Sequence, residues 1–427
     1  MSSAALRVER AVSDETALEA RLFATRRLSL DLARPLTPED QTVQAMDDAS
    51  PTKWHLAHTT WFFETFALTP FSPRYQLFNE RFGFCFNSYY ETQGPRHPRP
   101  MRGMLTRPSV AEVSAYRAHV DAALRELFST GAAQEPALAA ILELGLHHEQ
   151  QHQELLLTDI LALFAVNPLR PAYREPTEQP TSHDRAPSWV AFEGGIRGVG
   201  HEGGGFHWDN EEPRHDVLLH PFRLCARLVT NGEWLEFMRD GGYQQPILWL
   251  ADGWAQVRRE GWRAPLYFEE CDGSWRQMSF EGLCELDLRA PVCHVSFYEA
   301  DAFARWAGKR LPTEFEWEIA ALGADTRAND LASRLLRPAP APAGGGLQQM
   351  FGDVWEWTQS AYLPYPGYRA PAGAIGEYNG KFMSNQMVLR GGSCVTPAGH
   401  TRASYRNFFY PHQRWQFTGV RLAEQAE

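Results

Sequence analysis

Two histidines separated by one helical turn are the residues best placed for chemistry in this sequence. They lie in the segment His148-Glu149-Gln150-Gln151-His152. In a helix this spacing puts both imidazoles on one face, where they can reach a single metal ion. The same face carries apolar residues in the turns before and after, so both rings are expected to point into a core. The pattern therefore favours a metal site over a pair of hydrogen-bonded core histidines.

A third histidine ligand is expected from an earlier helix that contains His55 and His58. His58 shares a helical face with Trp54, Trp61 and Phe62, so its ring should point inward. His55 is rotated about 100° from Trp54 on that face. We therefore predict His58 as the third ligand.

Three neutral imidazoles leave up to three coordination positions open on a metal ion. This suits an Fe(II) centre that must hold both a substrate and O2. A zinc ion with three histidines and one water would use a single open position, for hydrolysis. The spacing of the histidines does not separate these two metals.

The histidine pair also matches the pattern H-E-x-x-H of zinc metalloproteases, in which Glu149 would be the general base. In its extended form that pattern continues with a glycine and a third histidine, which do not follow His152. A zinc hydrolase that uses His148, Glu149 and His152 is therefore kept as an alternative.

The elements that must position these histidines are helices. Apolar residues recur at helical spacing over about 18–166. The start signals predict one helix after Ser50-Pro51, one at about 109–129 and a long one at about 135–166. Antiparallel helices of these lengths predict a four-helix bundle.

A second domain of different texture follows the bundle. Five prolines among polar residues between Pro168 and Pro187 indicate a linker. After Trp189, short aromatic and β-branched runs alternate with glycines, and one clear helix is expected at 297–307. The predicted fold class is α+β, with a bundle that holds the metal at 1–170, a Pro-rich linker at 171–188 and an irregular, loop-rich domain at 189–427.

Composition and charge argue against several classes of function. The 427 residues carry a formal net charge of -11 and a pI of about 5.8, whereas nucleic-acid binding needs an excess of Lys and Arg. An anionic membrane surface is disfavoured for the same reason. No stretch approaches the ~20 apolar residues of a membrane span, and the first residues do not resemble a secretory signal. We therefore expect a cytoplasmic protein with small-molecule substrates and leave a homo-oligomer open.

Both halves of the chain are similar to a known family. The segments SPTKWHLAH at 50–58 and HEQQHQE at 148–154 resemble the DinB-like bundle of ergothioneine-biosynthetic sulfoxide synthases, also called hercynine oxygenases. The second half is similar to the formylglycine-generating-enzyme or sulfatase-modifying fold, a relative of the C-type lectin fold. The motifs that carry this similarity are VTN at 229–231, GKRLPTEFEWE at 308–318, GDVWEW at 352–357 and RGGS at 390–393. Formylglycine-generating enzymes use a cysteine pair shortly after RGGS, whereas only Cys394 stands there, so copper-dependent cysteine oxidation is not expected.

The resemblance implies that His58, His148 and His152 hold Fe(II). Hercynine, the betaine of histidine, and a cysteine-type thiol would bind beside the metal. The thiol is either cysteine or γ-glutamylcysteine. The implied reaction joins the sulfur to imidazole C2 and oxidises it to a sulfoxide with one O2. C–S bond formation supplies two electrons and sulfoxidation two more, so no further cosubstrate is needed.

The resemblance also implies roles for two motifs of the first half. FNSYYE at 86–91 resembles a subgroup with a tandem tyrosine pair, so Tyr89 and Tyr90 are the candidate catalytic proton donors to reduced oxygen. A phenol suits this task because its pKa near 10 keeps it protonated at neutral pH. HPRPMR at 97–102 matches a motif whose arginines, here Arg99 and Arg102, bind carboxylates of the thiol substrate.

Three more substrate-binding residues follow from the resemblance. YRNFFYP at 405–411 is similar to the segment that contacts the trimethylammonium and carboxylate of hercynine, which assigns Asn407 and Phe408 to the substrate. An aromatic wall suits a quaternary ammonium. In the better-known subgroup an acidic residue stands where this chain has Phe409. Gln151 matches a position that hydrogen-bonds the substrate imidazole.

Other functions compatible with the same residues are kept open. A sibling enzyme on this scaffold would attach sulfur to histidine itself, or selenium to hercynine. A zinc hydrolase would use Glu149 as its base. A binding module with a degenerate bundle would not need the histidines for any reaction.

Overall fold

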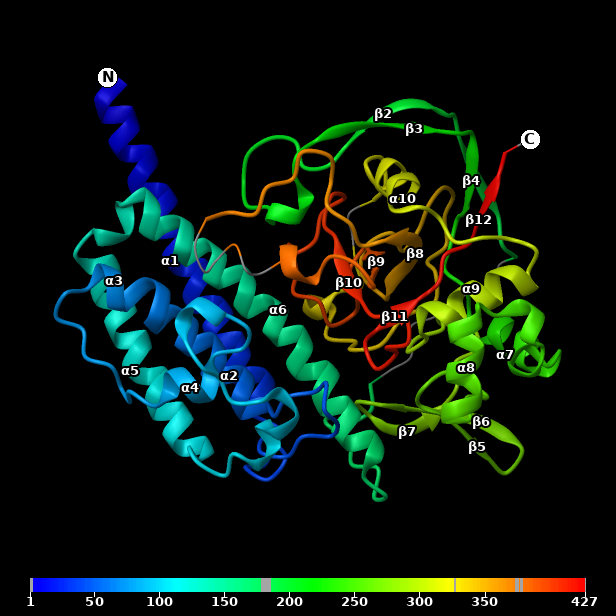
Figure 1. Ribbon diagram of the computed structural model, residues 1–427, viewed down its shortest axis with the longest axis horizontal. Coiled ribbons are helices and arrows are strands. Elements are labelled where there is room, and N and C mark those ends of the chain that lie inside the picture. Colours follow the sequence, from blue (N-terminus) through cyan, green and yellow to red (C-terminus); the bar gives the residue numbers. More distant parts are fainter. Residues whose placement is uncertain (1–2, 178–185, 326–327, 373–375, 377–378, 427) are drawn as a thin grey trace. The chain divides into compact units, whose positions relative to one another are not determined.

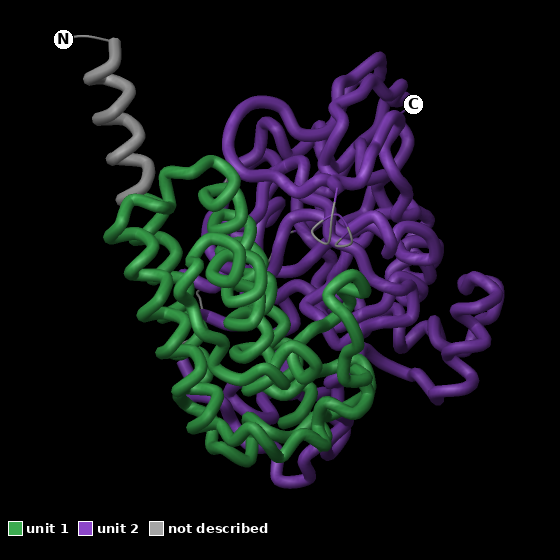
Figure 2. Tube along the Cα trace, turned by 60° about the vertical axis from the view of Figure 1, so that its left-hand side comes forward, with its two compact units in different colours: residues 1–166, 373–375 green, residues 167–372, 376–427 purple. Residues whose placement is uncertain are grey.

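The computed structural model of the chain describes residues 3–177, 186–325, 328–372, 376 and 379–426, with the backbone alone for residues 3–16. The chain divides into two compact units: of the described residues, those up to Val166 form unit 1 and those from Asn167 on form unit 2 (Figure 2). Part of the predicted linker, 178–185, lies outside the described residues. In the described part of the chain, no helix has both the length and the apolar character needed to cross a membrane.

Unit 1 is built from helices, drawn in blue to green in Figure 1. They are α1 (Ser3–Ala33), α2 (Thr52–Phe63), α3 (Thr69–Phe71), α4 (Phe82–Phe86), α5 (Val110–Ser129) and α6 (Pro136–Val166). α2 packs against α1, α5 and α6, and α1 also packs against α6. The predicted four-helix bundle is therefore confirmed, with the metal-ligand candidates on α2 and α6.

Local capping explains where the helices of unit 1 begin. At the start of α5, Ser109 Oγ accepts a hydrogen bond from Glu112 N at 3.2 Å, and the Glu112 carboxylate accepts one from Ser109 N at 2.7 Å. The Ser-Pro pair predicts Ser50 as the cap of α2, but α2 begins at Thr52 with Pro51 at the cap position. The Ser50 hydroxyl instead accepts a hydrogen bond from Arg102 at 2.9 Å. The prediction for Ser50 is therefore wrong.

Unit 2 combines four small sheets with short helices in its described part. Its helices are α7 (Asn231–Arg239), α8 (Ala251–Glu260), α9 (Phe297–Trp306) and α10 (Glu314–Ala321). Its strands are β1 (Trp189–Phe192), β2 (Gly195–Val199), β3 (His215–Leu219), β4 (Phe222–Cys225), β5 (Phe268–Cys271), β6 (Ser274–Ser279), β7 (Gly282–Glu285), β8 (Trp355–Ala361), β9 (Met387–Arg390), β10 (Asn407–Phe409), β11 (Thr418–Gly419) and β12 (Ala423–Gln425).

The sheets of unit 2 confirm the predicted α+β class with a loop-rich second half. The largest has the order β10-β9-β8-β11, and β11 runs parallel to β8 while the other pairs are antiparallel. The others are β1-β4-β12, β5-β6-β7 and the hairpin β2-β3. The helix predicted at 297–307 corresponds to α9.

Buried ion pairs hold the edge strand β10 in place. Arg406, the residue before β10, lies 2.8 Å from Glu314 at the start of α10. The same carboxylate also lies 2.8 Å from Arg390 at the end of β9. All three side chains are buried, so their charges must be compensated by one another. This network anchors the backbone on which Asn407 and Phe408 are presented.

Candidate metal centre

α2 and α6 bring His58, His148 and His152 together. One ligand atom from each residue lies within 4.8 Å of the other two. Nε2 of His58 and Nε2 of His148 are 3.2 Å apart. Two nitrogens that each bind one ion at about 2.1 Å, at an angle of about 90–110°, are about 3.0–3.4 Å apart. The three histidines therefore fit a metal ion, and the predicted residues are the ones that meet.

The ring of His58 is held between two tryptophans. The ring of Trp54 stacks on it at 4.7 Å between centroids, and Trp61 stacks at 5.7 Å. His58 Nδ1 lies 2.6 Å from the carbonyl oxygen of Phe86, to which it donates when protonated. That hydrogen bond leaves a lone pair on Nε2, the nitrogen that faces His148. The packing thus presents His58 in the form that binds a metal.

Burial also keeps the three imidazoles neutral. It lowers the pKa of His148 to about 3. For His58, burial and then the neighbouring charge of His148 hold the pKa well below its ordinary value. The pKa of His152 is depressed in the same way by burial and then by His58. Neutral imidazole is the form that binds metal ions, so the site needs no prior loss of protons at neutral pH.

Metal binding is consequently expected to release almost no protons at pH 6.0. Three imidazoles with an ordinary pKa near 6.5 would together release about two protons at that pH. Here the lowered pKa values mean that the protons are already absent from the metal-free protein. Calorimetric titration with Co(II), in two buffers of different ionisation enthalpy, counts the protons directly. A release of two protons would contradict the burial argument.

The carboxylate of Glu149 belongs to a buried ionic cluster. Its Oε2 accepts a hydrogen bond from Arg26 at 2.9 Å, and its Oε1 accepts one from Ser29 at 2.6 Å and another from Arg117. Burial alone would raise the pKa of Glu149, but the charges of Arg117 and Arg26 outweigh it and the pKa is lowered. A carboxylate whose two oxygens are held by cations is a poor general base. The geometry therefore gives the zinc-hydrolase alternative no support.

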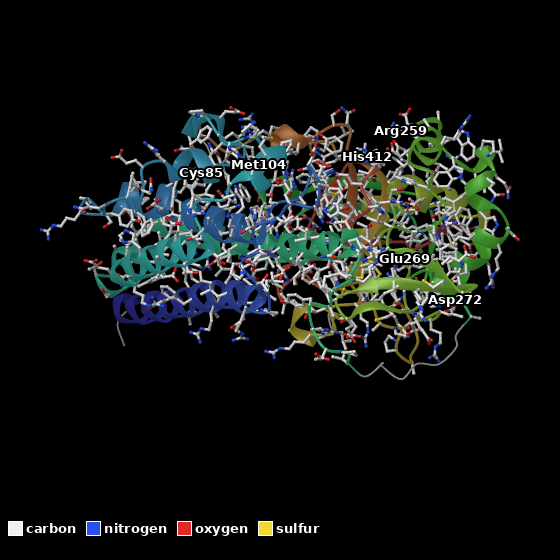
Figure 3. All side chains as sticks on the ribbon, turned by 90° about the horizontal axis from the view of Figure 1, so that it is seen from below. Cys85, Met104, Arg259, Glu269, Asp272 and His412 are labelled. Carbon is white, nitrogen blue, oxygen red and sulfur yellow. The ribbon has the colours of Figure 1, made fainter. Side chains whose placement is uncertain are left out.

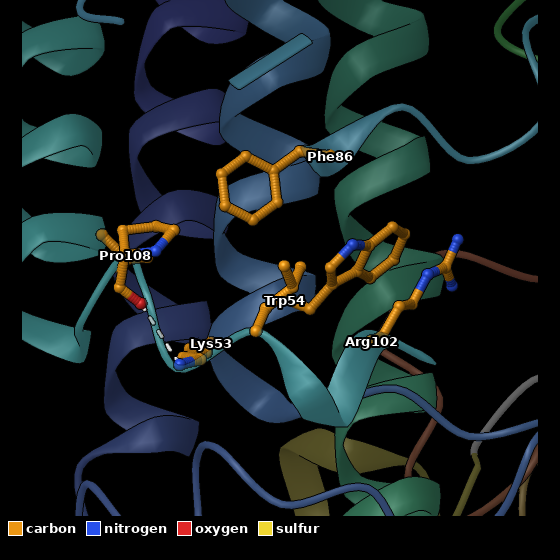
Figure 4. Close-up of a pocket in the computed structure, with 7 residues that line it drawn as sticks. Lys53, Trp54, Phe86, Arg102 and Pro108 are labelled. Carbon is orange, nitrogen blue, oxygen red and sulfur yellow. Dashed lines mark hydrogen bonds between the residues drawn. The ribbon is translucent and has the colours of Figure 1, made fainter. Parts of the chain in front are cut away.

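The two arginines of the predicted carboxylate site differ in their surroundings. Arg99 is exposed and donates to the backbone oxygen of Asp48. Arg102 is buried, with its guanidinium carbon 3.4 Å from the ring centroid of Trp54. Met104 nearby is 70% exposed, so the chain returns to the surface within one turn (Figure 3). Arg102 and Trp54 line a pocket with Lys53, Phe86, Leu105, Pro108 and Val113 (Figure 4).

Arg102 is a buried cation with little negative charge around it. It donates to the hydroxyls of Ser50, at 2.9 Å, and Ser88, at 3.3 Å. Its Nε has no hydrogen-bond partner among the residues that the structure describes. Burial, followed by the charge of Arg99, holds the pKa of Arg102 well below its ordinary value. An anion bound here would offset the free-energy cost of burying this positive charge.

The tandem tyrosines are fixed by an asparagine loop beside the histidine site. Asn87 Oδ1 accepts a hydrogen bond from Tyr90 N at 3.1 Å, and its Nδ2 donates to the Tyr90 carbonyl at 3.0 Å. The ring of Tyr90 is 1% exposed and lies 5.7 Å from Trp61, which stacks on His58. Tyr89 stacks on Tyr90 at 5.0 Å. One aromatic contact chain therefore connects both tyrosines to a ligand candidate.

The remaining predicted substrate-binding residues lie on α6 and β10. Gln151 is partly buried on α6 between His148 and His152. Asn407 and Phe408 belong to β10 of unit 2. Asn407 Oδ1 accepts a hydrogen bond from Phe408 N at 2.9 Å, and the Phe408 ring stacks on Tyr362 at 4.0 Å.

Several residues around the site do not follow from the sequence argument. His55 and Asp159 contact each other beside His152, and Arg26 and Arg117 bind Glu149. One usable signal exists for Asp159, which lies seven residues after His152 and therefore on the same face of α6. The arginines are far from Glu149 in sequence and carry no such signal.

Comparison with known proteins agrees with both units. Residues 173–332 and 336–426 match the Sulfatase-modifying factor enzyme 1-like domain, and residues 21–156 match the DinB superfamily. The hercynine oxygenase of Mycobacterium tuberculosis is 37% identical over 77% of this chain and 81% of its own. That of Mycolicibacterium smegmatis is 35% identical over the same shares. The formylglycine-generating enzyme of Streptomyces coelicolor is 31% identical over 62% of this chain and 98% of its own. The chain thus carries both domain families and is 35–37% identical to these two hercynine oxygenases over 77% of its length. It therefore belongs to the hercynine oxygenase family.

Proposed function

We propose that the protein is an Fe(II)- and O2-dependent sulfoxide synthase that joins a cysteine-type thiol to imidazole C2 of hercynine in ergothioneine biosynthesis. The observation that carries the proposal is the cluster of His58, His148 and His152 in a chain of the hercynine oxygenase family. The overall reaction balances as imidazole C–H plus thiol S–H plus O2, giving the C–S sulfoxide and one water. No nicotinamide or flavin is required.

Three neutral histidines are the part of the chain that would hold the iron. Bound Fe(II) would supply open positions at which O2 and the substrates can be activated together. The stacked tryptophans hold the His58 ring, and the helical spacing of His148 and His152 keeps their rings on one face. Fixed donors of this kind cost no rearrangement when the metal binds.

Arg102 is the residue that we assign to the carboxylate of the thiol substrate. Two features support this assignment. The guanidinium of Arg102 is buried with little negative charge to compensate it, and it stacks on Trp54, which orients the planar group. Trp54, over whose ring Arg102 lies, also stacks on His58, so Arg102 lies near the proposed ligands. Arg99 is assigned a weaker, exposed role in the same recognition.

Hercynine recognition is assigned to Gln151, Asn407 and Phe408, as the family resemblance implies. Gln151 would hydrogen-bond the imidazole, and Asn407 would offer its amide to the betaine end. Phe408 would supply an aromatic surface for the trimethylammonium, which has no proton to donate and is attracted to ring faces. The phenols of Tyr89 and Tyr90 would deliver protons to reduced oxygen.

Product analysis tests this function. The protein is loaded with Fe(II) without oxygen, mixed with hercynine and either cysteine or γ-glutamylcysteine, and then aerated. We expect a thioether sulfoxide at imidazole C2 from at least one thiol, and mass spectrometry identifies which. Parallel reactions with histidine or with a selenium donor test the sibling chemistries. Absence of any oxygen-dependent sulfoxide from hercynine would contradict the proposal.

Removing one phenol is expected to separate proton delivery from metal binding. If Tyr89 or Tyr90 is the proton donor, its replacement by phenylalanine should slow turnover by about 10²-fold or more, while Fe(II) affinity stays unchanged. Tyr75→Phe is the matched control, because its hydroxyl lies 2.7 Å from Glu64 instead. Initial rates of the three variants and of Tyr89→Phe/Tyr90→Phe provide the test. A double variant within about threefold of wild type would contradict the assignment.

A further inference from the structure

His55 is a buried histidine in α2 that links a proposed metal ligand to a carboxylate. Its Nδ1 lies 2.9 Å from Nδ1 of His152, and its Nε2 lies 3.0 Å from Oδ2 of Asp159. The rings of His55 and His152 are 5.2 Å apart between centroids. The three side chains therefore form a continuous row within unit 1.

The order of donors and acceptors in this row fixes where each proton lies. An ionised carboxylate only accepts, and Asp159 Oδ2 also accepts from Ser50 N at 2.8 Å. His55 Nε2 must therefore carry the proton that it shares with Asp159. If His55 is neutral, its Nδ1 has the lone pair and accepts from His152 Nδ1–H. This arrangement leaves the lone pair of His152 on Nε2.

The alternative proton arrangement is incompatible with metal binding by His152. If His55 carried both protons, its Nδ1–H would donate to His152 Nδ1. The proton of neutral His152 would then sit on Nε2, which could no longer bind an ion. His58 reaches the competent form by a different route, because its Nδ1 donates to the Phe86 carbonyl. Each of these two proposed ligands thus has its own acceptor behind it.

We infer that His55, oriented by Asp159, is a positioning residue that holds the tautomer and ring direction of His152 so that Nε2 faces the metal. The inference rests on the proposed function only in taking His152 as a ligand. Hydrogen-bonding groups behind a ligand typically change metal affinity by 10–100-fold when they are lost. His55 itself would act through His152 and would contact neither metal nor substrate.

Asp159 also connects this row to the proposed carboxylate site. Ser50 donates its N–H to Asp159 and accepts from Arg102 through its hydroxyl. The negative charge of Asp159 raises the pKa of Arg102, against the larger effect of burial. Substitution of Asp159 would therefore disturb two functions at once. Substitution of His55 is the sharper test, because the hydrogen bonds of its side chain within the described part of the chain are to His152 and Asp159.

Two replacements of His55 and one matched control test the inference through metal affinity. His55→Leu fills the space but cannot hydrogen-bond, and we expect Co(II) affinity to fall about 10–100-fold. His55→Gln can accept from His152 and donate to Asp159, so it should restore affinity to within about threefold of wild type. Gln41→Leu removes a buried amide elsewhere in unit 1 and should leave affinity unchanged.

The outcomes separate this inference from the proposed function. If the His55→Leu variant binds Co(II) like wild type, if glutamine does no better than leucine, or if Gln41→Leu loses as much affinity as His55→Leu, the positioning role is overturned. If the wild-type protein binds no metal, the proposed metal site itself fails.

A further measurement does not depend on the variants folding. In the Zn(II)-loaded wild-type protein, ¹⁵N spectra of histidine rings should show His152 protonated at Nδ1, and a proton on Nε2 would overturn the inference.

Discussion

Replacing His148 with alanine should remove iron binding and turnover together. The ring is 1% exposed and lies 3.2 Å from His58 at Nε2, so no other side chain can take its place without repacking the bundle. Loss of a direct ligand should weaken Fe(II) affinity by more than the roughly 100-fold typical of changes behind a ligand. Iron content after anaerobic reconstitution and the initial rate of sulfoxide formation provide the two readouts.

A histidine outside the cluster serves as the control for this variant. His119 is exposed on α5 and its Nε2 lies 3.0 Å from the backbone oxygen of Gln76, so His119→Ala should retain iron and activity. A binding module with a degenerate bundle predicts that His148→Ala changes only local stability. Wild-type iron content in the His148→Ala variant would therefore refute the ligand assignment.

Replacing Glu149 with glutamine should destabilise unit 1 by about 3–5 kcal/mol, because it removes the carboxylate that pairs with the buried Arg117 and leaves Arg26 paired with Asp121 alone. Arg26 and Arg117 both contact this carboxylate and are almost completely buried. An amide oxygen carries no negative charge and does not offset the free-energy cost of burying these two guanidinium groups. Hydrogen exchange of peptides from α5 and α6, in the metal-free protein, measures the loss within unit 1.

Glu126→Gln provides the matched control, since Glu126 is exposed on α5 and the same chemical change there should alter stability by less than about 0.5 kcal/mol. The zinc-hydrolase alternative predicts a different result for Glu149→Gln. It requires a variant that folds as stably as wild type, keeps its metal and loses a hydrolytic activity. That combination would contradict the structural role of Glu149.

The helices that carry the candidate ligands could be predicted because their signal is local. His148 and His152 need only the helical repeat, and His58 needs only its shared face with Trp54 and Trp61. In unit 2 the apolar pattern predicts α9 alone among the helices. Capping boxes also mark the starts of α7, at Thr230 and Glu233, and α10, at Thr313 and Glu316. These four-residue signals are present in the sequence and would have indicated both helices.

The surroundings of the candidate ligands could not be predicted because they depend on contacts between distant segments. The helical face that His58 shares with Trp54 predicts that His58, and not His55, lies next to His148, and the structure has this contact. The helical repeat gives no information on what His55 contacts. That contact is made by Asp159, on another helix. In the same way, Arg99 and Arg102 stand in one motif, and only the packing of Arg102 on Trp54 shows which of them is buried.

The origin of the sulfoxide oxygen shows whether the protein carries out a single oxygenation at the three histidines. The Fe(II)-loaded protein is mixed with hercynine and its thiol and exposed to ¹⁸O2 in ordinary water. A single oxygenation at the histidine centre predicts one ¹⁸O atom in the sulfoxide and the other in water, with one O2 consumed per product. His148→Ala should consume no O2 under the same conditions. A sulfoxide without label, or product formation without O2 uptake, would rule out the proposed oxygenation.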